Sequence, residues 1–229
     1  MLLVMTPADG RSGPADRPDQ PETRGERKER TRRAIMEAAL TLCEDSSLVA
    51  LSLRQVAKEV GIVPTAFYRH FDSIEDLGLA LVEDSFVSLR EMLRDVRHVD
   101  PQAEFRFRDI IDQSVSVLLE HTRHRNTHFA FISREWRAGP PAVREAVAHQ
   151  IELVERELAT DLSRLTPPSW THRDLRVLSN LIVTLSVGTT EALLGTRPSS
   201  SAESEIAERA RTQLRMLLVG AFQWHAQEE

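Results

Sequence analysis

The sequence has few of the residues that build disulfide-linked or strand-rich folds. Cys43 is the only cysteine in 229 residues, which excludes an internal disulfide and fits a reducing compartment. Glycine occurs nine times, tyrosine once, and aromatic residues make up 5% of the chain. Alanine, leucine and charged residues, which favour helices, are plentiful instead. The composition therefore predicts an all-α protein.

Long uncharged apolar runs are also missing. Met1–Met5 is too short for the apolar part of a secretory signal. The most apolar stretch, Leu175–Leu194, is interrupted by Arg176, Asn180 and Glu191, which argues against a membrane span. We expect a cytoplasmic protein without membrane association.

Charge is distributed unevenly along the chain. The formal net charge is −6, yet residues 24–33 hold six lysine or arginine residues against Glu26 and Glu29. A basic segment on an otherwise acidic chain is expected where one end meets nucleic-acid phosphates. This charge distribution, the composition and the motifs described below together predict that the chain has three parts. These are a disordered tail (1–22), a DNA-binding domain (23–72) and a helical body (73–229).

Apolar periodicity and helix-breaking residues predict helices throughout, with neither a strand pair nor an internal repeat. Capping boxes are predicted at Ser52 with Gln55 and at Thr171 with Asp174. The expected helices cover about 23–45, 52–61, 64–70, 73–96, 101–121, 127–136, 141–165, 171–194 and 203–225.

Two short helices joined by a tight turn predict a helix-turn-helix over Leu51–Phe71. Gly61 suits the end of the first helix, and Pro64 suits the first position of the second. Such a unit places its second helix in the major groove of DNA. Helical spacing puts Thr65, Tyr68 and Arg69 on its outward face. Packing of Tyr68 in the small core is the alternative.

Several blocks of this region resemble the TetR family of repressors over about residues 28–80. These blocks are Thr31–Ile35, Leu51–Ala57, Gly61-Ile62 and Phe67–Phe71. The resemblance implies an all-helical homodimer with three DNA-binding helices and a six-helix body that binds a small molecule. The DNA contacts that it implies, together with those from the spacing, are Thr31, Arg32, Ser52, Arg54, Thr65, Ala66, Tyr68, Arg69 and His70.

Two positions depart from the family pattern. Val63 stands where many members have a capping Ser or Thr, and Ile74 lies near the usual place of a phosphate-binding Lys. We hypothesise that the basic run Arg24–Arg33 compensates for the missing contact.

Further blocks are similar to the branch of this family that controls fatty-acid synthesis and desaturation: Pro64–Tyr68, Leu77–Leu79, Phe129–Glu135 and Val143–Val147. This similarity implies a long-chain acyl-CoA or acyl-carrier-protein ligand, and a drug or another lipophile is the alternative. The expected ligand contacts are Phe105, Phe129, Ile132, Arg134, Trp136, Asn180 and Thr184. Ordinary core packing is the alternative for the aromatic residues, and a buried interhelical hydrogen bond is the alternative for Asn180 and Thr184.

The last two helices are expected to form the dimer interface, although packing against the body is the alternative for each residue. The predicted interface residues are Leu181, Leu185, Thr189, Leu214, Leu218 and Ala221. His121, His124 and His128 share a helical stripe, but a break beside two arginines favours a loop over a metal site. We expect no cofactor and no enzymatic activity, because no nucleophile–base pair or phosphate loop is present. A ligand-independent adaptor is the remaining alternative.

Overall fold

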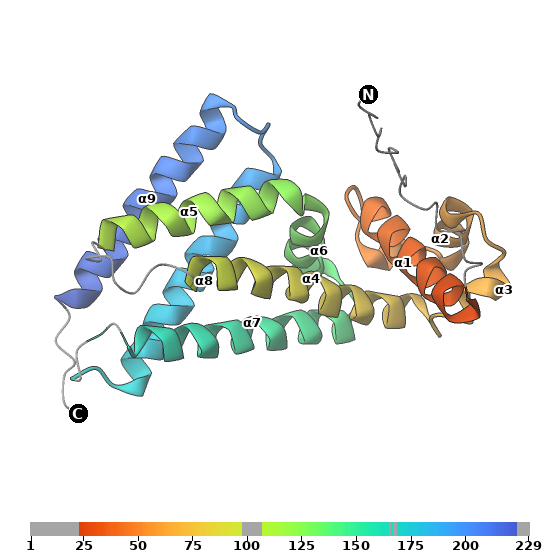
Figure 1. The fold of residues 1–229 in the computed structure, drawn as a ribbon, viewed down its shortest axis with the longest axis horizontal. Helices are drawn as coiled ribbons and strands as arrows, with labels where there is room; N and C mark the ends of the chain where they lie inside the picture. Colours follow the sequence, from red (N-terminus) through yellow and green to blue (C-terminus); the bar gives the residue numbers. More distant parts are fainter. Residues whose placement is uncertain (1–22, 98–106, 165, 167–168, 224–229) are drawn as a thin grey trace, which may run out of the picture.

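The chain forms a three-helix end joined to a six-helix body, as the computed structural model shows (Figure 1). The structure describes residues 23–97, 107–164, 166 and 169–223. The elements of the three-helix end are α1 (Arg24–Leu42), the 3-10 turn η1 (Leu48–Ala50), α2 (Leu53–Val60) and α3 (Pro64–Phe67). The body consists of α4 (Ile74–Arg97), α5 (Phe107–His124), α6 (Asn126–Ala138), α7 (Pro141–Leu162), α8 (His172–Leu194) and α9 (Ser201–Phe222). Within the described residues every regular element is helical, which confirms the all-α prediction.

Local capping explains where several helices begin. Ser52 and Gln55 form the predicted capping box before α2, and Thr171 and Asp174 form the one before α8. Each box satisfies amide donors that a helix start leaves without partners. A third box at Thr23 begins α1, one residue from the expected start.

The structure differs from the expected helices in three places. Helix α1 ends at Leu42, and the unpredicted turn η1 follows, capped by the side chain of Ser47. Helix α3 ends at Phe67, and turns carry the chain on through His70. Helix α9 begins at Ser201 because Ser200 accepts a hydrogen bond from the amide of Glu203. These differences follow from local hydrogen bonds that apolar spacing does not report.

Helix α4 belongs to the cores of both groups of helices. Phe67 and Phe71, from the helix-turn-helix, lie in one continuous apolar cluster with Leu77 and Phe86 of α4. Val143 of α7 belongs to the same cluster. The three-helix end is therefore packed onto the body, and α4 runs from one to the other (Figure 1).

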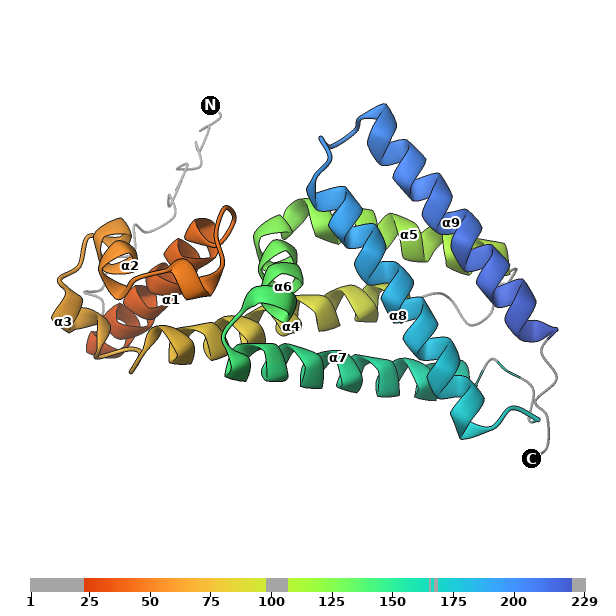
Figure 2. The same cartoon turned by 180° about the vertical axis from the view of Figure 1, so that it is seen from behind.

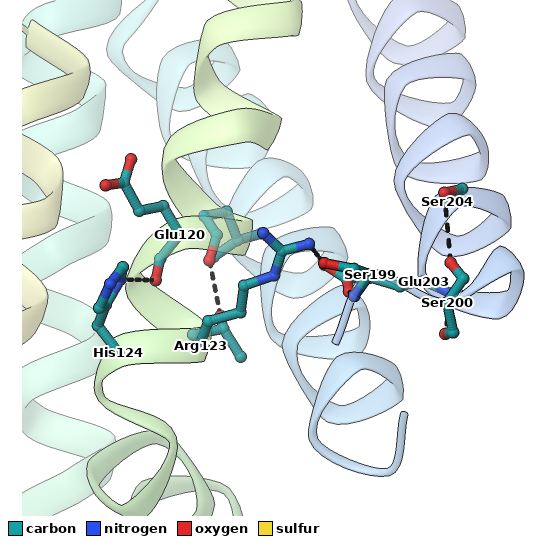
Figure 3. Close-up of polar contacts among 9 residues, drawn as sticks. Glu120, Arg123, His124, Ser199, Ser200, Glu203 and Ser204 are labelled. Carbon is teal, nitrogen blue, oxygen red and sulfur yellow. Dashed lines mark hydrogen bonds and ion pairs between the residues drawn. The ribbon is translucent and has the colours of Figure 1, made fainter. Parts of the chain in front are cut away.

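A second cluster holds α5 against α9. Ile111 and Val115 of α5 pack with Ala207 and Leu214 of α9. Near the other end of α5, Arg123 forms an ion pair with Glu203, which also accepts a hydrogen bond from the amide of Ser199 (Figure 3). Apolar packing and a buried carboxylate thus both fix α9.

Helix α8 packs against α7 and α9 (Figure 2). Among the described residues, its span His172–Leu194 is the one helix whose length and composition would allow it to cross a membrane. A single helix of this kind is weak evidence for a membrane span, and the contacts of α8 make it part of the body.

Candidate nucleic-acid interface

The turn between α2 and α3 has the backbone that its sequence predicts. Gly61 ends α2 with a positive φ of 74°, a conformation that glycine adopts without steric cost. Val63 provides no side-chain cap, as expected, and Pro64 begins α3, where no amide donor is needed. The two short helices therefore form the predicted helix-turn-helix.

The outward face of α3 consists of the residues that helical spacing selects. Thr65, Tyr68 and Arg69 are exposed, with Tyr68 at 59%, whereas Phe67 and Phe71 are fully buried. The ring of Tyr68 meets the edge of Phe67 and still points to solvent. Its hydroxyl is therefore available to a partner outside the chain.

Arg32 has a structural role that the sequence did not indicate. Its guanidinium donates a 2.8 Å hydrogen bond to the backbone carbonyl of His70 and lies 4.1 Å from the ring centre of Phe71. A cation stacked on an aromatic face and bonded to a carbonyl is held in place. Arg32 therefore fastens α1 to the segment that follows α3, and its expected DNA contact remains a prediction.

A cleft of about 260 Å³ lies between the first turns of α1 and the segment that follows α3. It is lined by Gly25, Lys28, Glu29, Arg32, Arg69 and His70. Glu29 pairs with Arg33, at 3.3 Å. Lys28 and Arg69 have no ion-pair partner among the residues that the structure describes. The cleft therefore holds an excess of positive charge.

The imidazole of His70 responds to these neighbours. Its Nδ1 atom is buried and has no hydrogen-bond partner in the described part of the chain. Burial lowers the pKa of His70, and the nearby charges of Lys28, Arg32 and Arg69 lower it further. Glu29, which also lines the cleft, acts in the opposite direction. Three cations against one carboxylate leave the cleft positive, which suits a phosphate group.

Of the remaining predicted DNA contacts, Thr31 and Ser52 form hydrogen bonds within the chain, whereas Arg54 and Ala66 differ in exposure. Arg54 is exposed on α2, and Ala66 is half-buried. The hydroxyl of Thr31 donates to the carbonyl of Arg27, and that of Ser52 takes part in its capping box. Lys28 is the neighbour of Arg69 and His70 that sequence spacing did not single out. Lys28 lies four residues before Arg32 on α1, so helical spacing places the two side chains on the same face, and this spacing could have identified Lys28 from the sequence.

The predicted ligand contacts do not gather around one cavity. Phe105 lies outside the described residues. Phe129 is buried beside Leu118, whereas Ile132 and Trp136 lie against the main core. Asn180 and Thr184 are exposed, and Asn180 bonds to Glu155 of α7 at 2.9 Å. The polar pocket or buried bond expected for these two residues is therefore corrected to a surface position.

The larger cleft, about 750 Å³, lies where the end of α1 meets α6 and the end of α8. Glu44, Ser133 and Leu194 contribute to its walls, as do Arg134 and Arg137. The guanidinium of Arg134 bonds to backbone carbonyls and that of Arg137 to Glu191. The two guanidinium groups at this cleft are therefore already bonded within the protein.

Five of the six residues expected at the dimer interface are buried or half-buried within the chain itself. Leu214 is 8% exposed in the α5–α9 cluster, and Leu185 and Leu218 pack against that cluster. Thr189 is buried, with its hydroxyl bonded to the carbonyl of Leu185, and Ala221 is half-buried. Leu181 alone of the six is exposed. The large apolar side chains that face solvent on these helices are Val177, Leu181, Met216 and Val219.

The three histidines of the possible metal stripe lie on two helices. His121 and His124 belong to α5, and His128 belongs to α6. The Nδ1 atom of His128 lies 3.1 Å from the hydroxyl of Ser85 on α4. No cluster of three metal-ligating side chains occurs in the parts of the chain that the structure describes.

Comparison with known proteins agrees with this geometry. Residues 35–81 match the sequence model of "Bacterial regulatory proteins, tetR family". Solved structures with the same fold include a TetR transcriptional regulator from Legionella pneumophila, at 17% identity, 86% coverage of this chain, 98% of that chain and a TM-score of 0.59. Another is GusR from Salmonella enterica, at 19% identity, 85% and 96% coverage and a TM-score of 0.63.

A third similar structure is the fatty acid degradation regulator FadR from Bacillus halodurans, at 11% identity, 83% and 95% coverage and a TM-score of 0.64. At this low sequence identity the comparison shows a similar fold and says nothing about the ligand of this chain. Residues 35–81 thus match the tetR family of bacterial regulatory proteins, and the chain has the fold of solved TetR-type transcriptional regulators.

Proposed function

We propose that the protein is a dimeric transcription regulator, acting as a repressor, which binds operator DNA through α3 and the basic cleft beside it. The observation that carries the proposal is the cleft itself, in which Lys28 and Arg69 have no carboxylate partner among the described residues. Adjacent cations repel one another, and a DNA phosphate would relieve that repulsion. Thr65 and Tyr68 on the exposed face of α3 would then reach base edges and neighbouring phosphates.

Selection from a pool of random duplexes, followed by binding measurements over a range of salt concentrations, tests this function. We expect an enriched palindromic sequence and an affinity that falls steeply with salt, because each neutralised phosphate releases counterions. A protein that enriches no sequence and shows no salt dependence would contradict the proposal.

The proposed dimer uses the apolar face of α8 and α9 around Leu181 and Met216. Val177 and Val219 extend this face, and all four side chains are at least 45% exposed. Equivalent faces of two chains would bury it by two-fold symmetry. Leu181→Asp should shift the sedimentation coefficient to that of a monomer, whereas Val49→Asp, at another exposed apolar position, should not.

The proposed signal is a small apolar molecule, with a long-chain acyl thioester as the first candidate because of the similarity of Phe129–Glu135 and its neighbours to the fatty-acid branch. A molecule that prefers one geometry of the body would change the position of α4 and the spacing of the two recognition helices. Native mass spectrometry of protein from its own host would identify a co-purifying molecule. Addition of long-chain acyl-CoA or of free coenzyme A to the DNA complex would then separate an acyl signal from a drug or another lipophile.

A further inference from the structure

The turn η1 places one side chain of the DNA-binding domain inside the body. Leu48 is 1% exposed. A Cβ atom added at Gly78 of α4 would lie 2.3 Å from Cδ2 of Leu48 and 3.0 Å from Cγ2 of Val143 on α7. Leu48 therefore occupies the space that Gly78 leaves open, between two helices of the body.

The backbone of the same residue is held by a buried carboxylate. Glu135 of α6 has no exposed surface, and it accepts hydrogen bonds from the Leu48 amide at 2.9 Å and from the Ser47 hydroxyl at 3.2 Å. A carboxylate gives up strong hydration when it is buried and needs such donors in return. Gly139 provides the room, because a Cβ there would lie 2.7 Å from Oε2 of Glu135.

Arg134, the residue before Glu135, binds the adjoining end of α1. Its guanidinium donates to the carbonyl of Cys43 at 3.0 Å and to that of Glu44 at 2.6 Å. Consecutive residues of α6 therefore bind both ends of the connection between α1 and η1. The covalent connection between the DNA-binding domain and the body runs instead through the start of α4.

We propose that Glu135 is a positioning residue for DNA binding: through Leu48 it gives the DNA-binding domain a second attachment to the body, which fixes the direction of α3. Without these hydrogen bonds the apolar packing of the domain against α4 would remain, but the domain could turn about that contact. The inference rests on the proposed function.

Cys43 reports the state of this attachment without an added label. It is the only cysteine, 1% exposed, and burial raises the pKa of its thiol to about 12. In Glu135→Ala we expect a thiol reagent to modify Cys43 about tenfold faster than in the wild type, since the Leu48 amide loses its acceptor. The charge of Glu135 also helps to raise the pKa of Cys43, so Glu135→Gln, which keeps the acceptor and removes the charge, measures the electrostatic part of any increase. The rate in Glu135→Ala should exceed that of Glu135→Gln.

The control is Glu191→Ala, which removes a carboxylate that bonds to Ser133 and Arg137 within the body. Its Cys43 should react at the wild-type rate. Urea unfolding of each variant gives the rate that global unfolding alone would allow. Equal rates in Glu135→Ala and Glu191→Ala, or a rate that global unfolding explains, would overturn the proposal. If Glu135→Ala does not fold, Ser47→Ala replaces it and should raise the rate of Cys43 modification by a smaller factor. An unchanged rate in Ser47→Ala would also overturn the proposal.

DNA binding provides the readout that destabilisation alone does not change. For a selected operator and a copy with one extra base pair between half-sites, the ratio of affinities measures how firmly the recognition helices are held. We expect this ratio to fall several-fold in Glu135→Ala and to remain unchanged in Glu191→Ala. An equal loss on both operators would refute positioning. If the wild type selects no operator, the proposed function fails, whereas the Cys43 rates still show whether Glu135 holds the domain.

Discussion

The two ends of the molecule use their cations differently. In the body, Arg123 pairs with Glu203, Arg137 with Glu191, and Arg211 with Asp112 at 3.5 Å. Beside α3, Lys28 and Arg69 share a cleft and have no such partner in the described part of the chain. Pairing within a chain contributes to the fold, whereas unpaired neighbouring cations oppose it slightly. Single cations of the body such as Arg176 and Arg209 also have no partner in the described part of the chain, so the difference is that two unpaired cations line one cleft beside α3. An external anion in that cleft is what we propose.

The largest effect is expected from removing the unpaired charges. Lys28→Ala with Arg69→Ala should weaken operator binding by about 10- to 100-fold and lower the salt slope by about 2, because two phosphate contacts are lost. The unfolding midpoint in urea should stay close to that of the wild type. Arg156→Ala, which removes one exposed ion pair of α7, is the control and should leave the affinity unchanged. An unchanged salt slope in the double variant would show that this cleft does not meet DNA.

Breaking a pair in the body should have the opposite pattern. Arg123→Ala leaves the carboxylate of Glu203, only 5% exposed, without its cation (Figure 3). We expect a loss of about 1–3 kcal/mol in the free energy of unfolding, less than for a fully buried pair because Arg123 is 42% exposed. Urea unfolding measures the loss.

A second substitution distinguishes an uncompensated charge from lost packing. Glu203→Gln in the Arg123→Ala background removes the buried charge and should restore part of the stability. The salt slope of DNA binding should be the wild-type one in both variants. A double variant no more stable than Arg123→Ala would mean that the charge of Glu203 is not the cause.

Residues of the helix-turn-helix could be predicted because their signals are local. The capping box of Ser52, the positive φ of Gly61 and the exposed position of Tyr68 depend on neighbours within a few residues. Contacts between distant segments have no such signal. Arg32 meets the carbonyl of His70, 38 residues away, and Glu135 meets Leu48, 87 residues away.

The exposed apolar face of α8 and α9 shows another limit of sequence patterns. Helix α9 has apolar residues on several sides, so spacing alone did not separate the buried Leu214 from the exposed Met216. That choice is made by α5 and α8, which pack against α9 and leave the side that bears Met216 exposed. The same reasoning applies to the expected ligand contacts. The packing of α6 and α8 places some of them in the core and others on the surface, so they do not line one cavity.

The pH dependence of DNA binding should reveal the same excess of positive charge. Burial and the charges of Lys28, Arg32 and Arg69 hold the pKa of His70 below its usual 6.5. A phosphate beside the imidazole would raise that pKa, so the complex binds a proton more readily than the free protein. Affinity should therefore increase as pH falls through and below 6.5, by about three- to tenfold.

His70→Asn tests this assignment, because it keeps a polar side chain that does not titrate. Fluorescence anisotropy at constant ionic strength would measure both proteins across the same pH range. A variant with the full pH dependence of the wild type would place the titrating group elsewhere.

The smallest effect is expected from Glu191→Gln, which removes an exposed pair of the body. Arg137 is 64% exposed, so the loss in the free energy of unfolding should be no more than about 0.5 kcal/mol and should shrink further in salt. The hydrogen bond from Arg137 lowers the pKa of Glu191, so this contribution exists above the unfolded value of 4.5 and disappears as pH falls through the lowered pKa. Urea unfolding on both sides of that range would measure it. A loss that is as large as that of Arg123→Ala, or that persists in acid, would mean that exposure does not separate the strong pairs of the body from the weak ones.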